Sequence, residues 1–191
     1  MNTAEQEKPQ LHMVWPASER PQCPAVAPAP GYTIRTYQDN DEQAFLHLMS
    51  QSDFDPWDDE KLSDNMNLVI PAGWFFAVDS EGRIVATAMG LHNYSGLSPF
   101  TGDVGWVFCH PDHRGHALGL ALCARVTQRF LEAGYTKIQL HTEYYRLPAI
   151  KTYLKLGFVP AVASSEDASI WADVCKQLNW PYELNAWKMQ E

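Results

Sequence analysis

The stretch from residue 103 to residue 133 constrains the fold more than any other part of this chain. Residues 103–109 read as a β-strand, residues 110–115 have the composition of a tight turn, and a helix is predicted over 116–133. Apolar side chains recur four apart on one face of that helix: Leu118, Leu122, Val126 and Phe130. The opposite face is polar. The helix is therefore expected to pack against a sheet on one side.

Further strands and helices are predicted on both sides of this unit. Upstream we expect a strand at 32–37, helices at 39–49 and 58–68, and strands at 74–78 and 84–92 joined by a hairpin turn at 79–82. Downstream we expect a strand at 137–142, a helix at 148–156 ended by Gly157, a strand at 158–162, a helix at 167–178 and a last strand at 183–188. This order predicts an α+β (mixed α/β) fold, with a central mixed sheet of about seven strands and helices on both faces.

Proline is concentrated in the first thirty residues. Because proline lacks a backbone donor and fixes φ, residues 1–30 are interpreted as a proline-rich N-terminal arm without regular helix or central strand. Met13, Val14 and Trp15 are apolar enough for part of the arm to pack on the rest of the protein. Residues 31–191 then form one domain, which is a common size.

Charge and cysteine content exclude several classes of function. Lys and Arg number 14 against 23 Asp and Glu, a net charge of −9, and no basic block stands out, so neither nucleic acid nor an anionic membrane is expected as a partner. The four cysteines form no CxxC pair or Cys/His cluster, so no metal site is expected. No secretory pattern or membrane-spanning apolar run is seen, which predicts a cytoplasmic protein with reduced thiols.

The turn before the helix at 116–133 has the composition of an anion site. Residues 114–119, Arg-Gly-His-Ala-Leu-Gly, put small residues where a helix begins and its first amides have no intrahelical partner. Gly115, Ala117 and Gly119 permit close approach, and Arg114 adds a cation, so a pyrophosphate fits. The alternative is a connection in which glycine serves only turn geometry and tight packing. The pattern is neither a Walker A sequence nor a dinucleotide fingerprint.

Two stretches resemble the GNAT superfamily of N-acetyltransferases. Residues 107–119 are similar to its acyl-CoA motif, Arg/Gln-x-x-Gly-x-Gly/Ala, with Arg114, Ala117 and Gly119 on the three positions and Ala where the family usually has Gly. Residues 149–158, Ala-Ile-Lys-Thr-Tyr-Leu-Lys-Leu-Gly-Phe, resemble its Ala-Ile-x-x-Tyr-x-x-Leu-Gly-Phe element. The two motifs stand in the family's order, so acetyl-CoA is the implied co-substrate.

The resemblance also implies a set of site residues. The donor is expected to lie between the strands ending near Cys109 and Thr142, which would splay apart. Its pantetheine would bind along Val107, Phe108 and Cys109, and its pyrophosphate at the turn formed by Arg114, Gly115, His116, Ala117, Leu118 and Gly119. Arg146 stands where the family often has Asn, at a donor-binding position. Tyr153 matches the tyrosine that protonates the departing thiolate, and its alternative role is core packing.

The resemblance implies direct attack of an amine on the thioester, which needs a neutral amine and so a route for its proton. Asp103 is the predicted base, because it lies near the place where some family members carry a carboxylate; a regular strand would point Asp103, Gly105 and Val107 to one face. An alternative is that Asp103 lies in solvent at the start of a strand. His92, His141 and Glu143 are rival bases, and a water chain could replace them all.

For the turn histidines, Cys109 and the segment 52–60, the sequence allows a structural as well as a functional interpretation. The turn histidines His110, His113 and His116 are expected to be solvated rather than metal ligands. Cys109 could form an acyl-cysteine, but no Cys/His/acid arrangement supports this. The acid- and aromatic-rich segment 52–60 would wall the acceptor site by family analogy, whereas Asp58, Asp59 and Glu60 could equally serve the first turn of a helix.

The predicted function is transfer of an acetyl group from acetyl-CoA to a small-molecule or peptide amine. Two alternatives stay open: a non-catalytic acyl-CoA-binding regulatory module, and another acyl-donor enzyme on the same fold. The acidic residues of the segment 53–64 favour a cationic or polar acceptor amine. The sequence does not set the oligomeric state, so a homodimer stays open.

Overall fold

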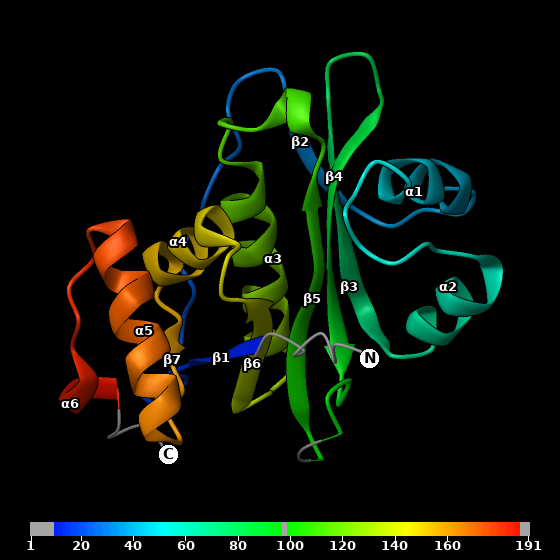
Figure 1. The fold of residues 1–191 in the computed structure, drawn as a ribbon. Helices are drawn as coiled ribbons and strands as arrows, with labels where there is room; N and C mark the ends of the chain where they lie inside the picture. The colour runs from blue at the N-terminus through cyan, green and yellow to red at the C-terminus, as the bar shows by residue number, and fades with distance from the viewer. Residues whose placement is uncertain (1–9, 97–98, 188–191) are drawn as a thin grey trace, which may run out of the picture.

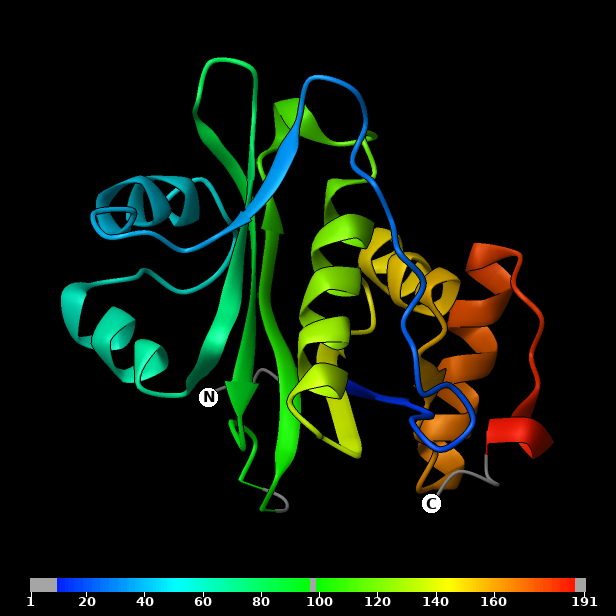
Figure 2. The ribbon, with the colours of Figure 1, turned by 180° about the vertical axis from the view of Figure 1, so that it is seen from behind.

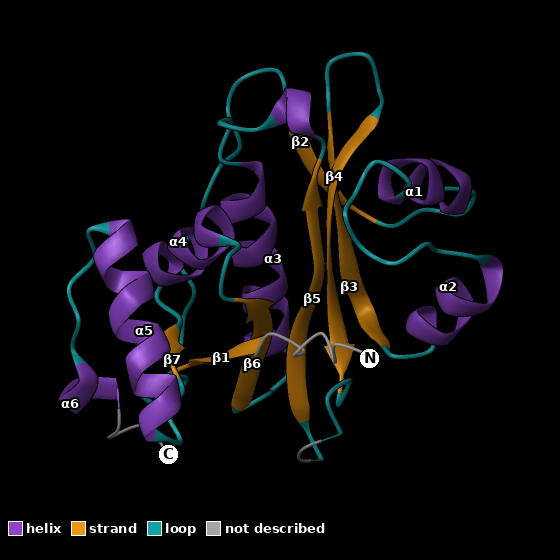
Figure 3. Cartoon of the chain, in the orientation of Figure 1, coloured by secondary structure: helices purple, strands orange, loops and turns teal. Residues whose placement is uncertain are grey.

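The computed structural model describes residues 10–96 and 99–187 (Figure 1). The strands are β1 (Gln10–Trp15), β2 (Thr33–Thr36), β3 (Val69–Val78), β4 (Ile84–His92), β5 (Thr101–Cys109), β6 (Lys137–Glu143) and β7 (Val159–Pro160). The helices are α1 (Glu42–Met49), α2 (Asp59–Met66), α3 (Leu118–Glu132), α4 (Leu147–Leu156), α5 (Ser165–Leu178) and α6 (Leu184–Trp187), with a 3₁₀ turn η1 (Pro111–His113). Figure 3 colours these elements by type.

Within the described residues all seven strands form one sheet, in the order β2-β3-β4-β5-β6-β1-β7. Neighbouring strands from β2 to β5 are antiparallel, whereas β5 and β6 are parallel. The prediction of an α+β fold with a mixed sheet of about seven strands is therefore confirmed. The predicted hairpin turn at 79–82 is also present and joins β3 to β4, with Asp79 accepting backbone hydrogen bonds in the turn.

The N-terminal arm contains a strand that the sequence analysis excluded. β1 lies between β6 and β7 and is antiparallel to both, with Met13 opposite Leu140 on one side and Pro160 on the other. The expectation of no central strand in residues 1–30 is wrong. Pro16 directly follows the strand rather than interrupting it, so the proline-free run 10–15 keeps its backbone donors.

The predicted last strand at 183–188 is also wrong within the described residues. Residues Leu184–Trp187 form the short helix α6, and residue 188 lies outside the described part of the chain. Trp187 is buried and its ring packs against Trp171 of α5, at 6.1 Å between ring centroids. The sheet therefore reaches seven strands through β1.

Helices cover the two faces of the sheet, as Figures 1 and 2 show from opposite sides. α3, α4 and α5 lie on one face over an apolar core that includes Leu122, Phe130 and Trp171, all fully buried. α1 and α2 lie on the other face over a second, strongly aromatic core around Phe45, Trp74 and Phe76. The apolar stripe predicted for the helix at 116–133 is thus the face of α3 that meets the sheet.

Candidate active site

β5 and β6 pair along only three residues and then separate. Their last pair is Asp103 with Gln139. Beyond it lies a cleft of about 570 Å³, walled by residues 104–107 of β5 and 140–143 of β6. Phe54, Asp55 and Lys61 line it from the α1–α2 connection and α2. The predicted splay of the two strands is present at the place where the donor was expected.

β5 is bent at Trp106, which has φ of +51°. This left-handed conformation costs a residue with a side chain about 1–2 kcal/mol, and the pairing of β5 with β4 shifts register nearby, between Thr87 and Met89. The regular alternation assumed for Asp103, Gly105 and Val107 is therefore broken, and Gly105, Trp106 and Val107 all line the cleft. The Trp106 indole donates a 2.6 Å hydrogen bond to Oδ1 of Asn65, which ties the bend to α2.

The three residues predicted to bind pantetheine lie in different surroundings. Val107 lines the cleft, whereas the Phe108 side chain is buried in the aromatic core under α1 and α2. The Cys109 thiol is half-buried, and its single hydrogen is shared between the carbonyl oxygens of His110 and His113. Burial raises its pKa to about 11. A protonated thiol outside the cleft lining is a poor nucleophile, which counts against an acyl-cysteine.

The turn at 114–119, called the cradle below, differs in one detail from its prediction. α3 begins at Leu118 instead of residue 116, and Ala117 precedes it as the N-cap with φ of +57°. The Ala117 methyl group was expected in a helical first turn and instead sits in the left-handed region, where glycine has no steric cost. Gly115 is also left-handed, with φ of +84°.

The cradle has donors and room for an anion. The amides of Leu118, Gly119 and Leu120 begin α3 and have no intrahelical acceptor, and among the described residues no other backbone acceptor is found for them. A Cβ added to Gly119 would meet no atom within 4 Å. Arg114 is exposed, and within the described chain it has no carboxylate partner. These residues fit a pyrophosphate.

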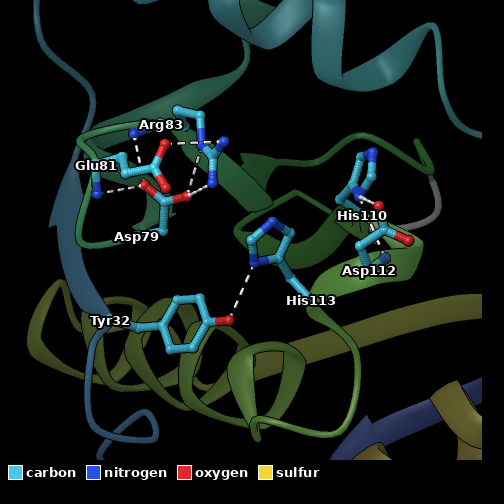
Figure 4. A network of polar contacts seen from close by, with 7 residues as sticks. All are labelled: Tyr32, Asp79, Glu81, Arg83, His110, Asp112 and His113. Carbon is cyan, nitrogen blue, oxygen red and sulfur yellow. Dashed lines mark hydrogen bonds and ion pairs between the residues drawn. The ribbon is translucent and has the colours of Figure 1, made fainter.

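Polar contacts fix the turn that leads into the cradle (Figure 4). The hydroxyl of Tyr32 and Nδ1 of His113 are 3.0 Å apart, and Nδ1 of His110 accepts from the amide of Asp112. The His116 ring lies 3.2 Å from the His113 carbonyl oxygen. Each of the three turn histidines thus has a local contact. No group of three or more metal-ligating side chains that could hold an ion occurs in the described ranges.

Tyr153 of α4 lines the cleft and is only 6% exposed. Burial raises the pKa of its phenol above the usual value, so the hydroxyl keeps its proton at neutral pH. Its ring also contacts Phe158 edge-on, at 6.4 Å between centroids. The side chain thus belongs to the core and to the wall of the cleft at once.

Asp103 is buried, 3% exposed, and does not lie in solvent at the strand start. Its Oδ1 accepts a 2.8 Å hydrogen bond from Nε2 of Gln139, and its Oδ2 accepts from the Tyr94 amide at 3.0 Å. Gln139 Nε2 also donates to Ser95 Oγ at 2.6 Å. Asp103 therefore binds together β5, β6 and the β4–β5 loop at the closed end of the cleft.

Arg146 is the N-cap residue of α4 and lines the cleft. Its guanidinium forms ion pairs with Glu143 at 2.6 Å and Asp53 at 3.0 Å, and lies 4.6 Å from the centre of the Phe54 ring. The positive charge is thus held in place by two acids and an aromatic ring.

Most of the acidic segment 53–64 has a structural role. Asp58 caps α2 by accepting from the Lys61 amide, and Asp59 and Glu60 lie in the first turn of α2. Asp53 pairs with Arg146, which leaves Asp55 as the acid of this segment that lines the described cleft. The helix-dipole interpretation accounts for the run 58–60.

The three rival bases, His92, His141 and Glu143, have different surroundings. His92 contacts the Tyr135 hydroxyl at 2.8 Å and is not part of the cleft wall. His141 and Glu143 both line the cleft from β6. Glu143 is engaged, because it pairs with Arg146 and accepts from Gln10. His141 is solvent-exposed and has no hydrogen-bond partner among the described residues.

Sequence reasoning missed three residues at the site. Trp106 required knowledge of the bend in β5. Lys61 carries no sequence pattern that marks it, yet its ammonium lies 5.1 Å from the centres of both the Trp57 and Trp106 rings. His12 belongs to the unpredicted strand β1, and its ring stacks on His141 with 4.6 Å between centroids. Only the alternation of Leu11, Met13 and Trp15 could have signalled it.

Comparison with curated proteins finds acetyltransferases. A mycothiol acetyltransferase from Corynebacterium aurimucosum is 33% identical over 123 residues, which cover 61% of this chain and 39% of the relative. A protein described as an acetyltransferase from Pectobacterium atrosepticum is 27% identical over 126 residues, covering 65% of this chain and 86% of the relative. The chain thus spans well under half of the first relative and most of the second. No helix in the described ranges is long and apolar enough to cross a membrane.

Solved structures show the same fold. A GCN5-related N-acetyltransferase from Sphaerobacter thermophilus superposes with a TM-score of 0.63 at 24% identity, over 81% of this chain and half of that one. The ribosomal-protein-S18-alanine N-acetyltransferase from Escherichia coli gives a TM-score of 0.56 at 20% identity, over 69% of this chain and 79% of that one. At these identities the likeness shows the fold alone. The model of the acetyltransferase (GNAT) family matches residues 36–158, well over half of the sequence, and the chain belongs to that family.

Proposed function

We propose that this protein is an acetyl-CoA-dependent N-acetyltransferase that acetylates an amine by direct attack on the thioester. One observation carries the proposal: β5 borders an open cleft and then leads directly into a turn of free amides at the start of α3. The anionic pyrophosphate of the donor needs the free amides, and its slender pantetheine arm needs the cleft, so the two features must lie side by side. Family membership and the names of the relatives support the same activity.

The residues can be given roles from their positions. The amides of Leu118 and Gly119, with Arg114, would bind the pyrophosphate. Val107 would line the path of the pantetheine arm in the cleft. When bound, the donor supplies an activated acetyl carbon and a thiolate leaving group. Tyr153, whose phenol stays protonated, would give the proton that the departing thiolate needs.

Binding and turnover test this function separately. Calorimetry with CoA and acetyl-CoA should show one site per chain. Thiol release should then be followed with a defined panel of the twenty amino acids, spermidine, phenethylamine and a lysine-containing peptide. Turnover with any of these amines supports the enzyme. The non-catalytic alternative predicts donor binding with no thiol release above the hydrolytic background for every amine tested.

A variant separates direct attack from an acyl-enzyme. Because Cys109 is a protonated thiol outside the cleft lining, Cys109→Ala should keep turnover within about twofold of the wild type. Intact-mass measurement of wild-type protein mixed with acetyl-CoA should find no thioester adduct on Cys109. A loss of turnover in the folded variant together with such an adduct would replace direct attack by a two-step route.

A further inference from the structure

Two histidines from strands far apart in sequence are stacked beside the cleft. His12 of β1 and His141 of β6 are directly opposite in the antiparallel pairing. Their rings are nearly parallel, 7° apart, with 4.6 Å between centroids. β1 lies outside residues 36–158, so the family match does not contain His12. β1 thus places His12, from outside the family match, against a residue that lines the cleft.

A chain of hydrogen bonds fixes the orientation of His12. Nε2 of Gln139 donates to the carboxylate of Asp103, so the other end of that amide, Oε1, must be the acceptor. Nε2 of His12 lies 2.9 Å from this oxygen and therefore carries the hydrogen. Asp103 thus determines, through Gln139, which nitrogen of His12 is protonated.

His141 is the member of the pair that faces the cleft. It lies two residues beyond Gln139, where β5 and β6 have just parted, on a wall opposite Gly105 and the bend at Trp106. The ring is exposed and its nitrogens have no partner among the described residues. It is therefore open to an amine that enters the cleft.

The surroundings of His141 lower the pKa of its imidazole and so favour the neutral ring. Burial by its neighbours, then repulsion from His12, lower the pKa of His141, while Asp103 opposes this. On β6, Glu143 is paired with Arg146. On the facing wall, Asp55 and Lys61 line the same cleft. A neutral imidazole has a free lone pair, which a base for an ammonium ion requires.

We propose that His141 is the catalytic base that takes the proton from the acceptor ammonium, and that His12 is its positioning residue, held by Gln139 and Asp103. The inference rests on the proposed acetyl transfer. One N–H bond of the ammonium breaks and its proton moves to a ring nitrogen of His141. The freed lone pair forms the C–N bond as the C–S bond breaks, and the thiolate takes the phenol proton of Tyr153. The acylated nitrogen then loses its second proton, which restores the proton of Tyr153, so the amide, the free thiol and protonated His141 remain. Asp103, predicted as the base, is assigned a positioning role instead, because its carboxylate is held by Gln139 and the Tyr94 amide.

The first test compares His141→Gln with His47→Gln. His47 is an exposed histidine of α1, so its variant is the matched control and should behave as the wild type. With the best amine from the panel above, His141→Gln should lower kcat/KM by about 100-fold or more. In this variant kcat/KM should no longer fall below neutral pH. Its affinity for CoA should stay within twofold of the wild type.

The second test addresses His12. His12→Phe keeps a stacked ring but removes the electrostatic repulsion that lowers the pKa of His141, so the acid limb of the kcat/KM profile should move to higher pH. Nitrogen NMR of the wild type should find His12 as the Nε2–H tautomer.

Each outcome has a separate meaning. No turnover of any amine by the wild type would overturn the proposed function, and the base with it. Turnover with an unchanged pH profile in folded His141→Gln would overturn the base assignment alone. An unshifted acid limb in His12→Phe, or the Nδ1–H tautomer of His12, would overturn the positioning role.

Discussion

Asp103 and Gln139 are the last residues at which β5 and β6 run side by side, and a 2.8 Å hydrogen bond joins their side chains there. The strands part immediately afterwards to form the cleft. The bond therefore closes the inner end of the site, and both partners are buried. Because the Tyr94 amide also donates to Asp103, removing the carboxylate takes the acceptor from that part-buried amide and from one of the two N–H groups of Gln139 Nε2.

Asp103→Ala should consequently lower the free energy of unfolding by about 1–3 kcal/mol for each donor left unpaired. Asp173→Ala, which removes an exposed carboxylate from α5, is the matched control and should change stability by less than about 0.5 kcal/mol. Urea unfolding measures both. Equal stability of the two variants would show that water replaces the carboxylate and that the inner end of the cleft is wet.

Gly119→Glu should abolish CoA binding without unfolding the protein. A side chain at this position meets no atom within 4 Å, so the fold tolerates it, but a carboxylate would stand among the amides offered to the pyrophosphate. Gly119→Ala is the control and should weaken binding far less. Calorimetry gives the affinities and thermal unfolding the integrity of each variant. Unchanged affinity in folded Gly119→Glu would remove the cradle from the donor site.

Tyr153→Phe should slow the chemical step by about 100-fold and leave donor affinity nearly unchanged. The ring stays in place against Phe158, so a packing role alone predicts almost no loss. Single-turnover rates with saturating acceptor distinguish the two roles. Because burial raises the pKa of the Tyr153 phenol above its usual value, the loss in the variant should be the same from neutral to mildly alkaline pH. A rate within twofold of the wild type would leave Tyr153 as core packing.

The Arg35–Asp41 pair should make stability depend on acid pH. Arg35 donates two hydrogen bonds to Asp41, at 2.6 and 2.8 Å, and this lowers the pKa of the Asp41 carboxyl. A lowered folded-state pKa adds stability that is complete above the unfolded pKa, near 4, and is lost as pH falls through the folded value. Asp41→Asn should therefore be less stable than wild type at pH 7, and the difference should shrink as pH falls below the unfolded pKa. Urea midpoints across pH measure this, and parallel curves would contradict it.

The sequence predicted most of the fold because its signals there are local. The stripe of α3 and the left-handed Gly157 that ends α4 can be read within one or two turns of helix. The anion site at the cradle stays a prediction, which rests on small residues at the start of a helix together with the family resemblance. The bend at Trp106 and the burial of Asp103 could not be predicted, because they depend on contacts with β4, α2 and β6 that are distant in sequence.

The missed strand β1 leads to a last prediction. Proline content suggested an arm, but Leu11, Met13 and Trp15 alternate in a proline-free run, and all three are buried. Met13 is 0% exposed and lies between β6 and β7. If β1 is integral to the sheet, Met13→Ala leaves a cavity in the main core and should cost about 2–5 kcal/mol.

A surface arm would lose almost nothing from the same change. Val14 is the neighbour that points to the other face and is only partly buried, so Val14→Ala is the matched control and should cost clearly less. Urea unfolding compares the two variants, and hydrogen exchange adds a local measure. The β1 amides should exchange as slowly as those of β6, because both strands open only with the sheet. If Met13→Ala lowers the free energy of unfolding by less than about 0.5 kcal/mol and residues 10–15 exchange fast, β1 is not part of the sheet. His12 would then not lie beside the cleft.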